Sequence, residues 1–225
     1  REDKSDPPQT QPIAERMPFP VVIGLTGGIA TGKSSASLAF SRRHLPVVDA
    51  DVIAREAVRP GMPAFWLIRL CFGQEVIAPS GELDRPKLGS IVFSNPSKRA
   101  LLNAITHPFI QCTMLFRLFK HIAVEGHRRV VMDIPLLFES KVFIPLCSKI
   151  VVVATSEETQ LRRLMLRNAL SEEDARKRMG SQIPLAEKRR RADFVIENDG
   201  SLDELDVRVE QFLSSLNPPT ASKSQ

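Results

Sequence analysis

The segment GGIATGKS, residues 27–34, constrains the fold more than any other part of this chain. It fits the pattern G-x-x-x-x-G-K-[ST], with Gly27, Gly32, Lys33 and Ser34 at the fixed positions. An apolar run precedes it and a helical pattern follows, which is the strand–loop–helix context that the pattern requires. Glycines let the backbone curl so that N–H groups point at phosphate oxygens, and a helix N-terminus attracts an anion. The sequence therefore predicts a loop that binds the phosphates of a nucleoside triphosphate.

Two residues at the end of this loop have separate expected roles. Lys33 is expected to reach the β- and γ-phosphates as a mobile point charge. The hydroxyl of Ser34 is expected to ligate Mg²⁺, because this hard cation takes oxygen ligands. The helix that follows is expected to span residues 33–44 and to aim its positive end at the phosphates.

Five short apolar runs lie along the chain, and their apolar residues stand together instead of alternating with polar ones. This pattern is typical of parallel strands that are covered on both faces. Helical patterns separate the runs, which indicates successive βαβ units. We therefore predict an α/β fold with a five-stranded parallel sheet flanked by helices. The expected strands lie at residues 20–25, 45–49, 129–134, 149–154 and 193–198.

Two segments between the expected strands are long enough to form substructures of their own. Residues 59–126 show helical periodicity and predict a helical insertion beside the sheet. Trp66 is expected in the core of this insertion, or alternatively in the lining of a channel for the substrate. Residues 161–192 are strongly basic. Ten basic and four acidic residues between positions 162 and 191 amount to +6, in a chain whose total charge is +5.

Local patterns predict helix starts within and just before the basic segment. Thr155 with Glu158 three residues later, and Ser171 with Asp174, both fit a helix-capping pattern. The run Lys188–Arg191 has two open interpretations: a solvated helix face, or a group of cations that neutralises the triphosphate from above.

The second expected strand ends in a pair of carboxylates, Asp49 and Asp51, in the sequence VVDADVIARE. In a phosphotransferase the acceptor hydroxyl lies near such a strand end, where a carboxylate can orient it or take its proton. The alternative is that Asp51 only caps a helix that begins near Val52. Two interpretations also remain for Asp133 and Glu139. Each could act on Mg²⁺ or the substrates, or could simply be a solvated residue near a strand end.

Composition limits the remaining possibilities. No apolar run reaches the roughly 18 residues of a membrane helix. Three separated cysteines and four histidines show no metal-site spacing, so we expect reduced thiols, no structural zinc and a cytoplasmic location. The lack of an apolar run of membrane length leads us to expect no membrane partner. Residues 160–192 contain no aromatic side chain on which a base could stack, so we expect no nucleic-acid partner either. The polar ends, 1–18 and 217–225, are expected to be disordered, and nothing in the sequence predicts the oligomeric state.

Several stretches, taken in order, resemble the dephospho-coenzyme A kinase family, and the resemblance covers residues 21 to about 213. It implies a P-loop kinase core with a helical substrate domain and a lid. It also implies a reaction in which ATP phosphorylates the ribose 3′-hydroxyl of dephospho-coenzyme A, a small-molecule substrate, to give coenzyme A and ADP. A nucleotide or nucleoside kinase on the same core is the alternative. The matching stretches are GLTGGIATGKS, VVDADVIAR, GELDRPKLGSIVF with LLNAITHPFI, DIPLLFE and RRADFVIENDG.

The resemblance also implies roles for individual residues and segments. It implies that Asp51 is the catalytic acid–base residue, and that Lys33, Arg163 and Arg167 act on the transferring phosphoryl group. ATP-binding residues would be Thr26, Gly27, Gly28, Ile29, Ala30, Thr31, Gly32, Lys33, Ser34, Ser35 and Asn198, with Asn198 near the adenine. Substrate-binding residues would be Asp49, Arg85 and His107, and Ser34 would be the metal ligand. The core would comprise residues 19–58, 127–160 and 193–216, with 59–126 as the coenzyme A-binding domain and 161–192 as the lid.

The loop departs from the family pattern at Ala30 and Thr31, where Gly and Ser are more usual. Thr31 still offers a hydroxyl, so we expect the same loop function.

Overall fold

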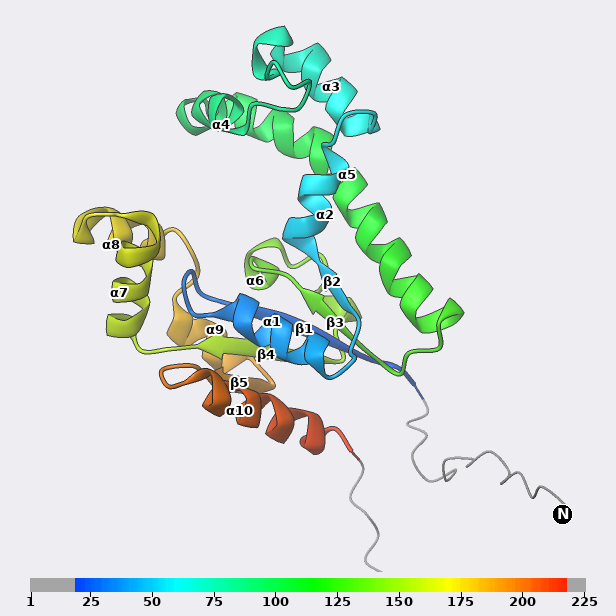
Figure 1. Cartoon of the computed structure of the whole chain (residues 1–225), viewed down its shortest axis with the longest axis vertical. Helices are drawn as coiled ribbons and strands as arrows, with labels where there is room; N and C mark the ends of the chain where they lie inside the picture. The colour runs from blue at the N-terminus through cyan, green and yellow to red at the C-terminus, as the bar shows by residue number, and fades with distance from the viewer. Residues whose placement is uncertain (1–18, 218–225) are drawn as a thin grey trace, which may run out of the picture.

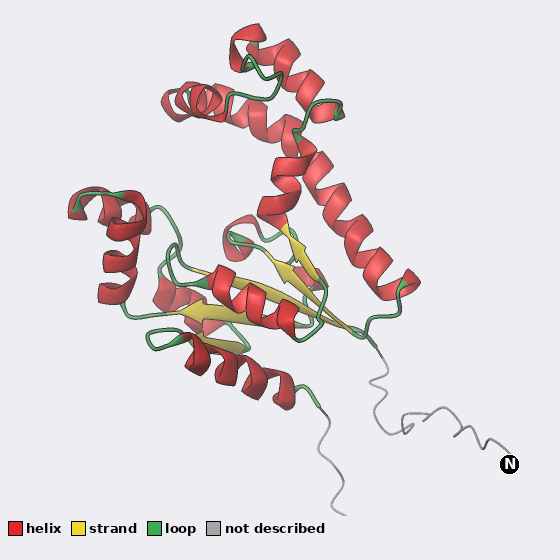
Figure 2. Ribbon diagram, viewed as in Figure 1, coloured by secondary structure: helices red, strands yellow, loops and turns green. Residues whose placement is uncertain are grey.

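A computed structural model describes residues 19–217 and shows an α/β fold built on a five-stranded parallel sheet (Figure 1 and Figure 2). The predicted fold class is confirmed. The expected disordered ends lie outside the described residues, apart from Asn217. The strands, in the spatial order β2-β3-β1-β4-β5, are β1 (Val21–Gly27), β2 (Val47–Asp49), β3 (Arg129–Asp133), β4 (Lys149–Ala154) and β5 (Phe194–Glu197).

Both faces of the sheet are buried, which explains why the strands are apolar throughout. Helices α1 (Lys33–Arg42) and α10 (Leu202–Ser215) cover one face, where Phe40 and Phe212 meet edge to face. On the other face, residues of α5 (Pro96–Phe119) and α6 (Leu137–Ser140) pack against alternate strand residues such as Val22. Helix α1 ends at Arg42, two residues before the expected end.

The segment between β2 and β3 forms a helical insertion with a hydrophobic core of its own. Figure 1 shows this insertion standing away from the sheet, with the long helix α5 reaching back to the sheet. The first part of α5 packs in the insertion through Ile105, and its last part packs on the sheet through Met114 and Leu118. The elements are α2 (Ala50–Ala57), α3 (Pro63–Phe72), η2 (Gln74–Val76), α4 (Arg85–Ser94), α5 (Pro96–Phe119) and η3 (Lys120–Val124).

The prediction that Trp66 lies in the core of the insertion is wrong. Phe65 and Ile68 of α3 are buried, whereas Trp66 is 53% exposed. The helical period places Trp66 on the outer face of α3, where the guanidinium of Arg69 lies over the indole ring at 5.5 Å from its centroid.

The remaining helices follow β3 and β4. They are α6 (Leu137–Ser140), η4 (Ile144–Leu146), α7 (Glu157–Asn168), α8 (Glu172–Gly180) and α9 (Leu185–Arg191). Helices α7 and α8 extend beyond the sheet, whereas α9 returns and packs beside β4 (Figure 1). None of the helices in residues 19–217 combines the length and the apolar composition needed to cross a bilayer.

The cysteines are unpaired, as expected. Cys71 and Cys112 are exposed free thiols, and Cys147 is partly buried against Gly24 of β1. Burial raises the pKa of the Cys147 thiol to about 11, so this group is protonated and unreactive at neutral pH.

Helix α7 begins at a different cap from the one predicted. Its N-cap is Ser156, whose hydroxyl accepts from the amide of Thr159. The hydroxyl of Thr155 instead donates to Asp199 at 2.6 Å. The predicted cap of α8 is confirmed, because Ser171 accepts from the amide of Asp174.

The carboxylate of Asp199 joins the loop after β5 to the start of α7. It also accepts from the amide of Ser156 at 3.0 Å and from its hydroxyl at 2.7 Å. Burial of the carboxylate opposes ionisation, but the hydrogen bonds from Thr155 and Ser156 outweigh it and hold the pKa of Asp199 well below its ordinary value.

The lowered pKa of Asp199 predicts a pH-dependent contribution to stability. This contribution is fully present above the unfolded-state pKa of about 3.9 and is lost as the pH falls from there towards the lower folded-state pKa. We expect Asp199→Asn to melt at a lower temperature than the wild type at pH 7, with a gap that narrows as the pH falls below about 4.

Thermal melts of both proteins between pH 7 and pH 3 measure this gap. Asp203→Asn is the matched control, because Asp203 is exposed two residues into the next helix and makes no side-chain hydrogen bond within residues 19–217. A gap for Asp199→Asn that stays constant with pH would contradict the assignment.

Candidate active site

A pocket of about 700 Å³ lies at the carboxyl ends of the central strands. Ligands of parallel α/β sheets bind at this edge, where the connecting loops diverge. The pocket brings together four residues expected to act in catalysis, which come from α1, α2 and α7. It is lined by residues 27–34, the phosphate loop, and by Asp51, Pro135, Arg163, Leu166, Arg167 and Gln182.

The backbone of the phosphate loop adopts left-handed conformations at two positions. Gly32 has φ +87°, and a Cβ there would lie 2.0 Å from the side-chain nitrogen of Asn198. Only glycine fits this position. Ala30 has φ +60°, a conformation that costs a non-glycine residue some strain, which accounts for the more usual glycine in the family pattern. The hydroxyl of Thr31 donates to the carbonyl of Gly28 at 2.9 Å and closes the turn.

Side chains behind the phosphate loop fix the direction of two of its peptide groups. Asn198 donates its amide to the carbonyl of Thr31 at 2.8 Å, and Lys188 donates to the carbonyl of Gly27 at 3.2 Å. No peptide in the described chain is cis, so the N–H that follows each carbonyl points the opposite way. The amides of Gly28 and Gly32 therefore face away from these side chains, and neither has an acceptor within residues 19–217. Such free amides are the donors that a phosphate chain requires.

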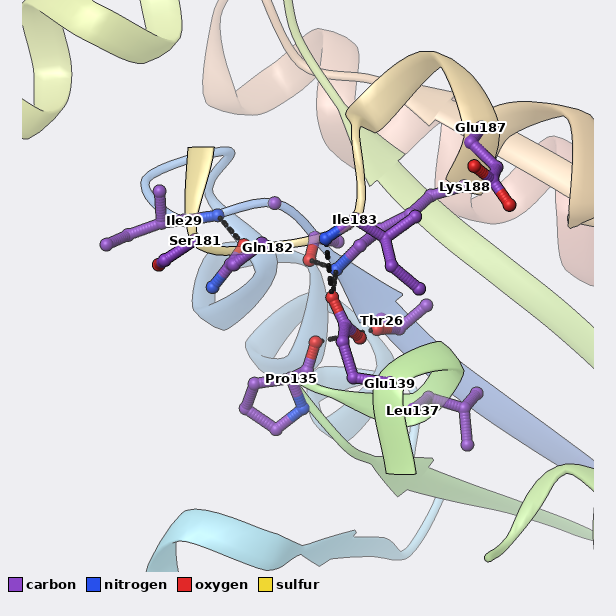
Figure 3. Close-up of polar contacts among 12 residues, drawn as sticks. Thr26, Ile29, Pro135, Leu137, Glu139, Ser181, Gln182, Ile183, Glu187 and Lys188 are labelled. Carbon is purple, nitrogen blue, oxygen red and sulfur yellow. Dashed lines mark hydrogen bonds and ion pairs between the residues drawn. The ribbon is translucent and has the colours of Figure 1, made fainter. Parts of the chain in front are cut away.

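The segment around α7 and α8 is bonded to the same loop at Ile29 (Figure 3). The side chain of Gln182, after α8, accepts from the amide of Ile29 at 3.0 Å. Gln160 of α7 donates to the carbonyl of Ile29 at 2.8 Å. Sequence reasoning missed both glutamines, because a glutamine in a helical pattern carries no spacing signal of its own.

The ammonium of Lys33 is paired with the carboxylate of Asp133 at the end of β3. Asp133 is 1% exposed. Burial raises the pKa of Asp133, and the adjacent Lys33 ammonium opposes that rise. Asp49 lies directly beside it in the register of β2 and β3. Acids therefore end two neighbouring strands, and the ammonium of Lys33, which lines the pocket, is paired with one of them.

The two carboxylates of the second strand have different positions. Asp49 is the N-cap of α2 and accepts from the amide of Val52 at 2.9 Å. The alternative that Asp51 caps this helix is therefore wrong, because α2 begins at Ala50 and places Asp51 in its first turn. Asp51 is exposed and lines the pocket.

Arg163 and Arg167 lie one helical turn apart on α7 and both line the pocket. Arg163 donates to the backbone carbonyl of Asn198 at 2.8 Å, and Arg167 donates to the neighbouring side chain of Asn168 at 3.0 Å. Two permanent cations therefore face the phosphate loop from the α7 side.

Other expected site residues lie outside the pocket. Arg85 and His107 are exposed in the insertion, and Arg85 donates to the carbonyl of Arg55 at 3.4 Å. Their contact with substrate stays a prediction, as does that of Asn198 with adenine. Thr26 is buried, and its hydroxyl donates to the carbonyl of Pro135 at 3.0 Å. Ser35 follows Ser34 in the first turn of α1.

Neither interpretation fits the whole run Lys188–Arg191, in which Arg190 and Arg191 are exposed but Lys188 is not. Lys188 is fully buried and paired with Glu139 at 2.8 Å. Arg189 forms two hydrogen bonds with the carboxylate of Glu197, and Arg191 lies over the ring of Phe138. These cations secure α9 to the core, and none of them lines the pocket.

Ser34, the predicted metal ligand, lies at the same end of the sheet as three carboxylates. The hydroxyl of Ser34 and the carboxylates of Asp49, Asp51 and Asp133 are the oxygen donors that Mg²⁺ prefers, and they lie at one end of the sheet.

Three residues at the end of α5 form a cluster that the spacing of the histidines did not indicate. His121, Glu125 and His127 have ligand atoms within 4.8 Å of one another at the end of α5. Lys120 also pairs with Glu125 at 3.2 Å, and none of these residues lines the pocket.

A phosphate loop at the sheet edge, with a carboxylate and two arginines facing it, defines a P-loop phosphotransferase. A family model described as dephospho-CoA kinase matches residues 21–204. The chain belongs to the dephospho-CoA kinase family.

Relatives agree with this assignment. Dephospho-CoA kinases of Arabidopsis thaliana and Bacillus cereus are 50% and 52% identical, over 88% of this chain and 84% and 98% of theirs. The solved structure of a Campylobacter jejuni dephospho-CoA kinase is 30% identical, with a TM-score of 0.66 over 87% of this chain and 96% of that one. A Thermus thermophilus structure is 34% identical, with a TM-score of 0.72 over 89% and 100%.

We expect Lys33→Ala to have two separable effects. Turnover should fall by roughly 10²–10³, because a cation is removed from the transferring phosphoryl group. The melting temperature should also fall, because Asp133 is left buried without its partner.

The double variant Lys33→Ala/Asp133→Asn separates the two effects. It should regain much of the lost melting temperature without regaining turnover, as measured by thermal melts and ADP release. Near-normal turnover in Lys33→Ala would contradict the role of the loop.

Proposed function

We propose that this chain transfers the γ-phosphoryl group of ATP to the ribose 3′-hydroxyl of dephospho-CoA, and that the products are coenzyme A and ADP. The observation that carries the proposal is the shared pocket, in which Asp51 lines the same cavity as a phosphate loop whose Gly28 and Gly32 amides have no acceptor among residues 19–217. Membership of the dephospho-CoA kinase family supports the choice of acceptor.

The proposed chemistry assigns one task to each group in the pocket. The free amides of the phosphate loop and the ammonium of Lys33 bind the β- and γ-phosphates. Asp51 accepts the proton of the 3′-hydroxyl while the 3′-oxygen forms a bond to the γ-phosphorus. The bond between the γ-phosphorus and the β–γ bridging oxygen breaks at the same time, which releases ADP. Arg163 and Arg167 offset the charge on the transferring group.

Mg²⁺ is part of this proposal. The hydroxyl of Ser34 and the nearby carboxylates would hold it, and the ion would neutralise charge between the β- and γ-phosphates. The oxygen-only donor set fits this ion better than it fits zinc or copper, which favour nitrogen or sulfur.

The two substructures beside the pocket have proposed roles as well. The insertion, residues 59–126, would bind the coenzyme through residues that include Arg85 and His107. Residues of α7 and α8, within 161–192, would close as a lid over ATP. A large acceptor needs a large surface, and an insertion with its own hydrophobic core supports dephospho-CoA over a small nucleoside. The free thiols support a reducing compartment such as the cytoplasm.

A panel of acceptors tests the proposed substrate. With ATP and Mg²⁺, dephospho-CoA should be turned over far faster than nucleosides or nucleoside monophosphates, as read by ADP release. Phosphorus NMR of the product should show a new monoester at the ribose 3′ position. Rapid turnover of a nucleoside monophosphate, with none of dephospho-CoA, would overturn the proposal in favour of a nucleotide kinase.

The role of Asp51 predicts a specific kinetic change. We expect Asp51→Asn to lower turnover by roughly 10²–10⁴, the usual contribution of a general base, while ATP affinity stays nearly intact. Asp49→Asn is the comparison variant, since asparagine can still cap α2. If Asp51→Asn kept its turnover and Asp49→Asn lost it, the base would be Asp49.

A further inference from the structure

A lysine is completely buried behind the phosphate loop. The side chain of Lys188 in α9 is 0% exposed, and its ammonium lies 2.8 Å from Glu139 Oε1 and 3.2 Å from the carbonyl oxygen of Gly27 (Figure 3). Lysine is among the residues least often buried, because removing its charge from water is costly. The complete burial of this charge therefore suggests that the ammonium has a specific role.

The partner of Lys188 has an incomplete set of hydrogen bonds among the described residues. Glu139 Oε1 accepts from Lys188 and also from the amide of Ile183 at 3.2 Å. Glu139 Oε2 is buried and has no hydrogen-bond partner within residues 19–217. An ion pair that leaves a carboxylate oxygen unsatisfied is a poor device for stability, since an apolar pair of similar volume is often as stable.

The contact with Gly27 gives the pair a function. Because the Gly27–Gly28 peptide is trans, the bond from Lys188 to the Gly27 carbonyl directs the Gly28 amide towards the opposite side. The Gly28 amide is unpaired among the described residues and belongs to the pocket. Lys188 is therefore bonded to the peptide group whose amide belongs to the pocket, without touching that amide.

The same pair lies at the end of the α7–α8 segment. Ile183, which donates to Glu139, follows Gln182, which accepts from the amide of Ile29. Figure 3 shows these contacts grouped on one side of the loop. The segment between α8 and α9 is therefore hydrogen-bonded both to the phosphate loop, through Gln182, and to the carboxylate of the ion pair, through Ile183.

We propose that Lys188 is a positioning residue for ATP: supported by Glu139, it holds the Gly27–Gly28 peptide in the orientation that binds phosphate. The proposal deepens the proposed kinase function and rests on it for the identity of the nucleotide. Lys188 reaches no reacting atom and acts through the backbone of the loop.

ATP binding in the absence of any acceptor tests the proposal separately from the proposed reaction. The test variant is Lys188→Met/Glu139→Gln, which removes both buried charges and keeps a side-chain oxygen for the amide of Ile183. Arg190→Met is the matched control, because it removes a cation from the exposed side of the same helix. Lys188→Met alone shows the effect of leaving Glu139 unpaired.

Calorimetry with ATP and Mg²⁺ gives the dissociation constant and the number of competent sites independently. A merely structural role would lower the number of sites and leave the dissociation constant unchanged. We expect the dissociation constant of the double variant to rise by about tenfold or more, the effect of losing one charged hydrogen bond. We expect no change for Arg190→Met.

Enzyme kinetics provide the second readout. In the double variant the KM for ATP should rise while the KM for the acceptor stays near the wild-type value. A double variant that binds ATP with the wild-type dissociation constant would overturn the proposal, whatever its melting temperature. Failure of the acceptor panel, by contrast, would leave the ATP-binding result intact.

Discussion

The site depends above all on the direction of the peptide groups in the phosphate loop. A phosphate chain is bound by backbone amides that point inward, and an isolated glycine-rich loop has no reason to keep them there. In this structure the carbonyls of Gly27 and Thr31 are held from behind by Lys188 and Asn198. The trans peptide geometry then directs the amides of Gly28 and Gly32 the other way. The loop is therefore preorganised by buried side chains from α9 and the end of β5.

Acidic and basic side chains from several elements lie around this loop. Acids end β2 and β3, Lys33 of the phosphate loop is paired with Asp133, and Arg163 and Arg167 line the pocket from α7. Phosphoryl transfer has a loose transition state, so positioning and charge neutralisation account for most of its catalysis. In the proposed mechanism, the base lies on one helix and the arginines on another, so closure of α7 would complete the site after ATP has bound.

The parts that could be predicted from the sequence are those with a local signal. GGIATGKS predicted the loop, and unbroken apolar runs predicted the five strands, because both reflect constraints within a few residues. Lys188 could not be identified in this way: within KRRR it looks like a solvated run, and only the packing of α9 beside β4 buries it. Asp51 was considered as the cap of α2 because Asp49 and Asp51 are equally good capping residues. The sequence DADV does not indicate at which of the two the helix starts. Trp66 was misplaced because its neighbours Phe65 and Ile68 are equally apolar, and periodicity alone did not separate the two faces of α3.

A bisubstrate ligand tests the central claim most directly, namely that one pocket holds the γ-phosphate of ATP beside the 3′-hydroxyl of dephospho-CoA. In this ligand the 3′-oxygen of dephospho-CoA is joined to the terminal phosphate of ATP through one additional phosphate. Its dissociation constant is measured by calorimetry beside those of ATP and dephospho-CoA alone. The account predicts that it binds at least about a hundredfold more tightly than either, since the two halves share one entropic cost of association. Binding no tighter than that of ATP alone, with dephospho-CoA still free to bind afterwards, would contradict the account.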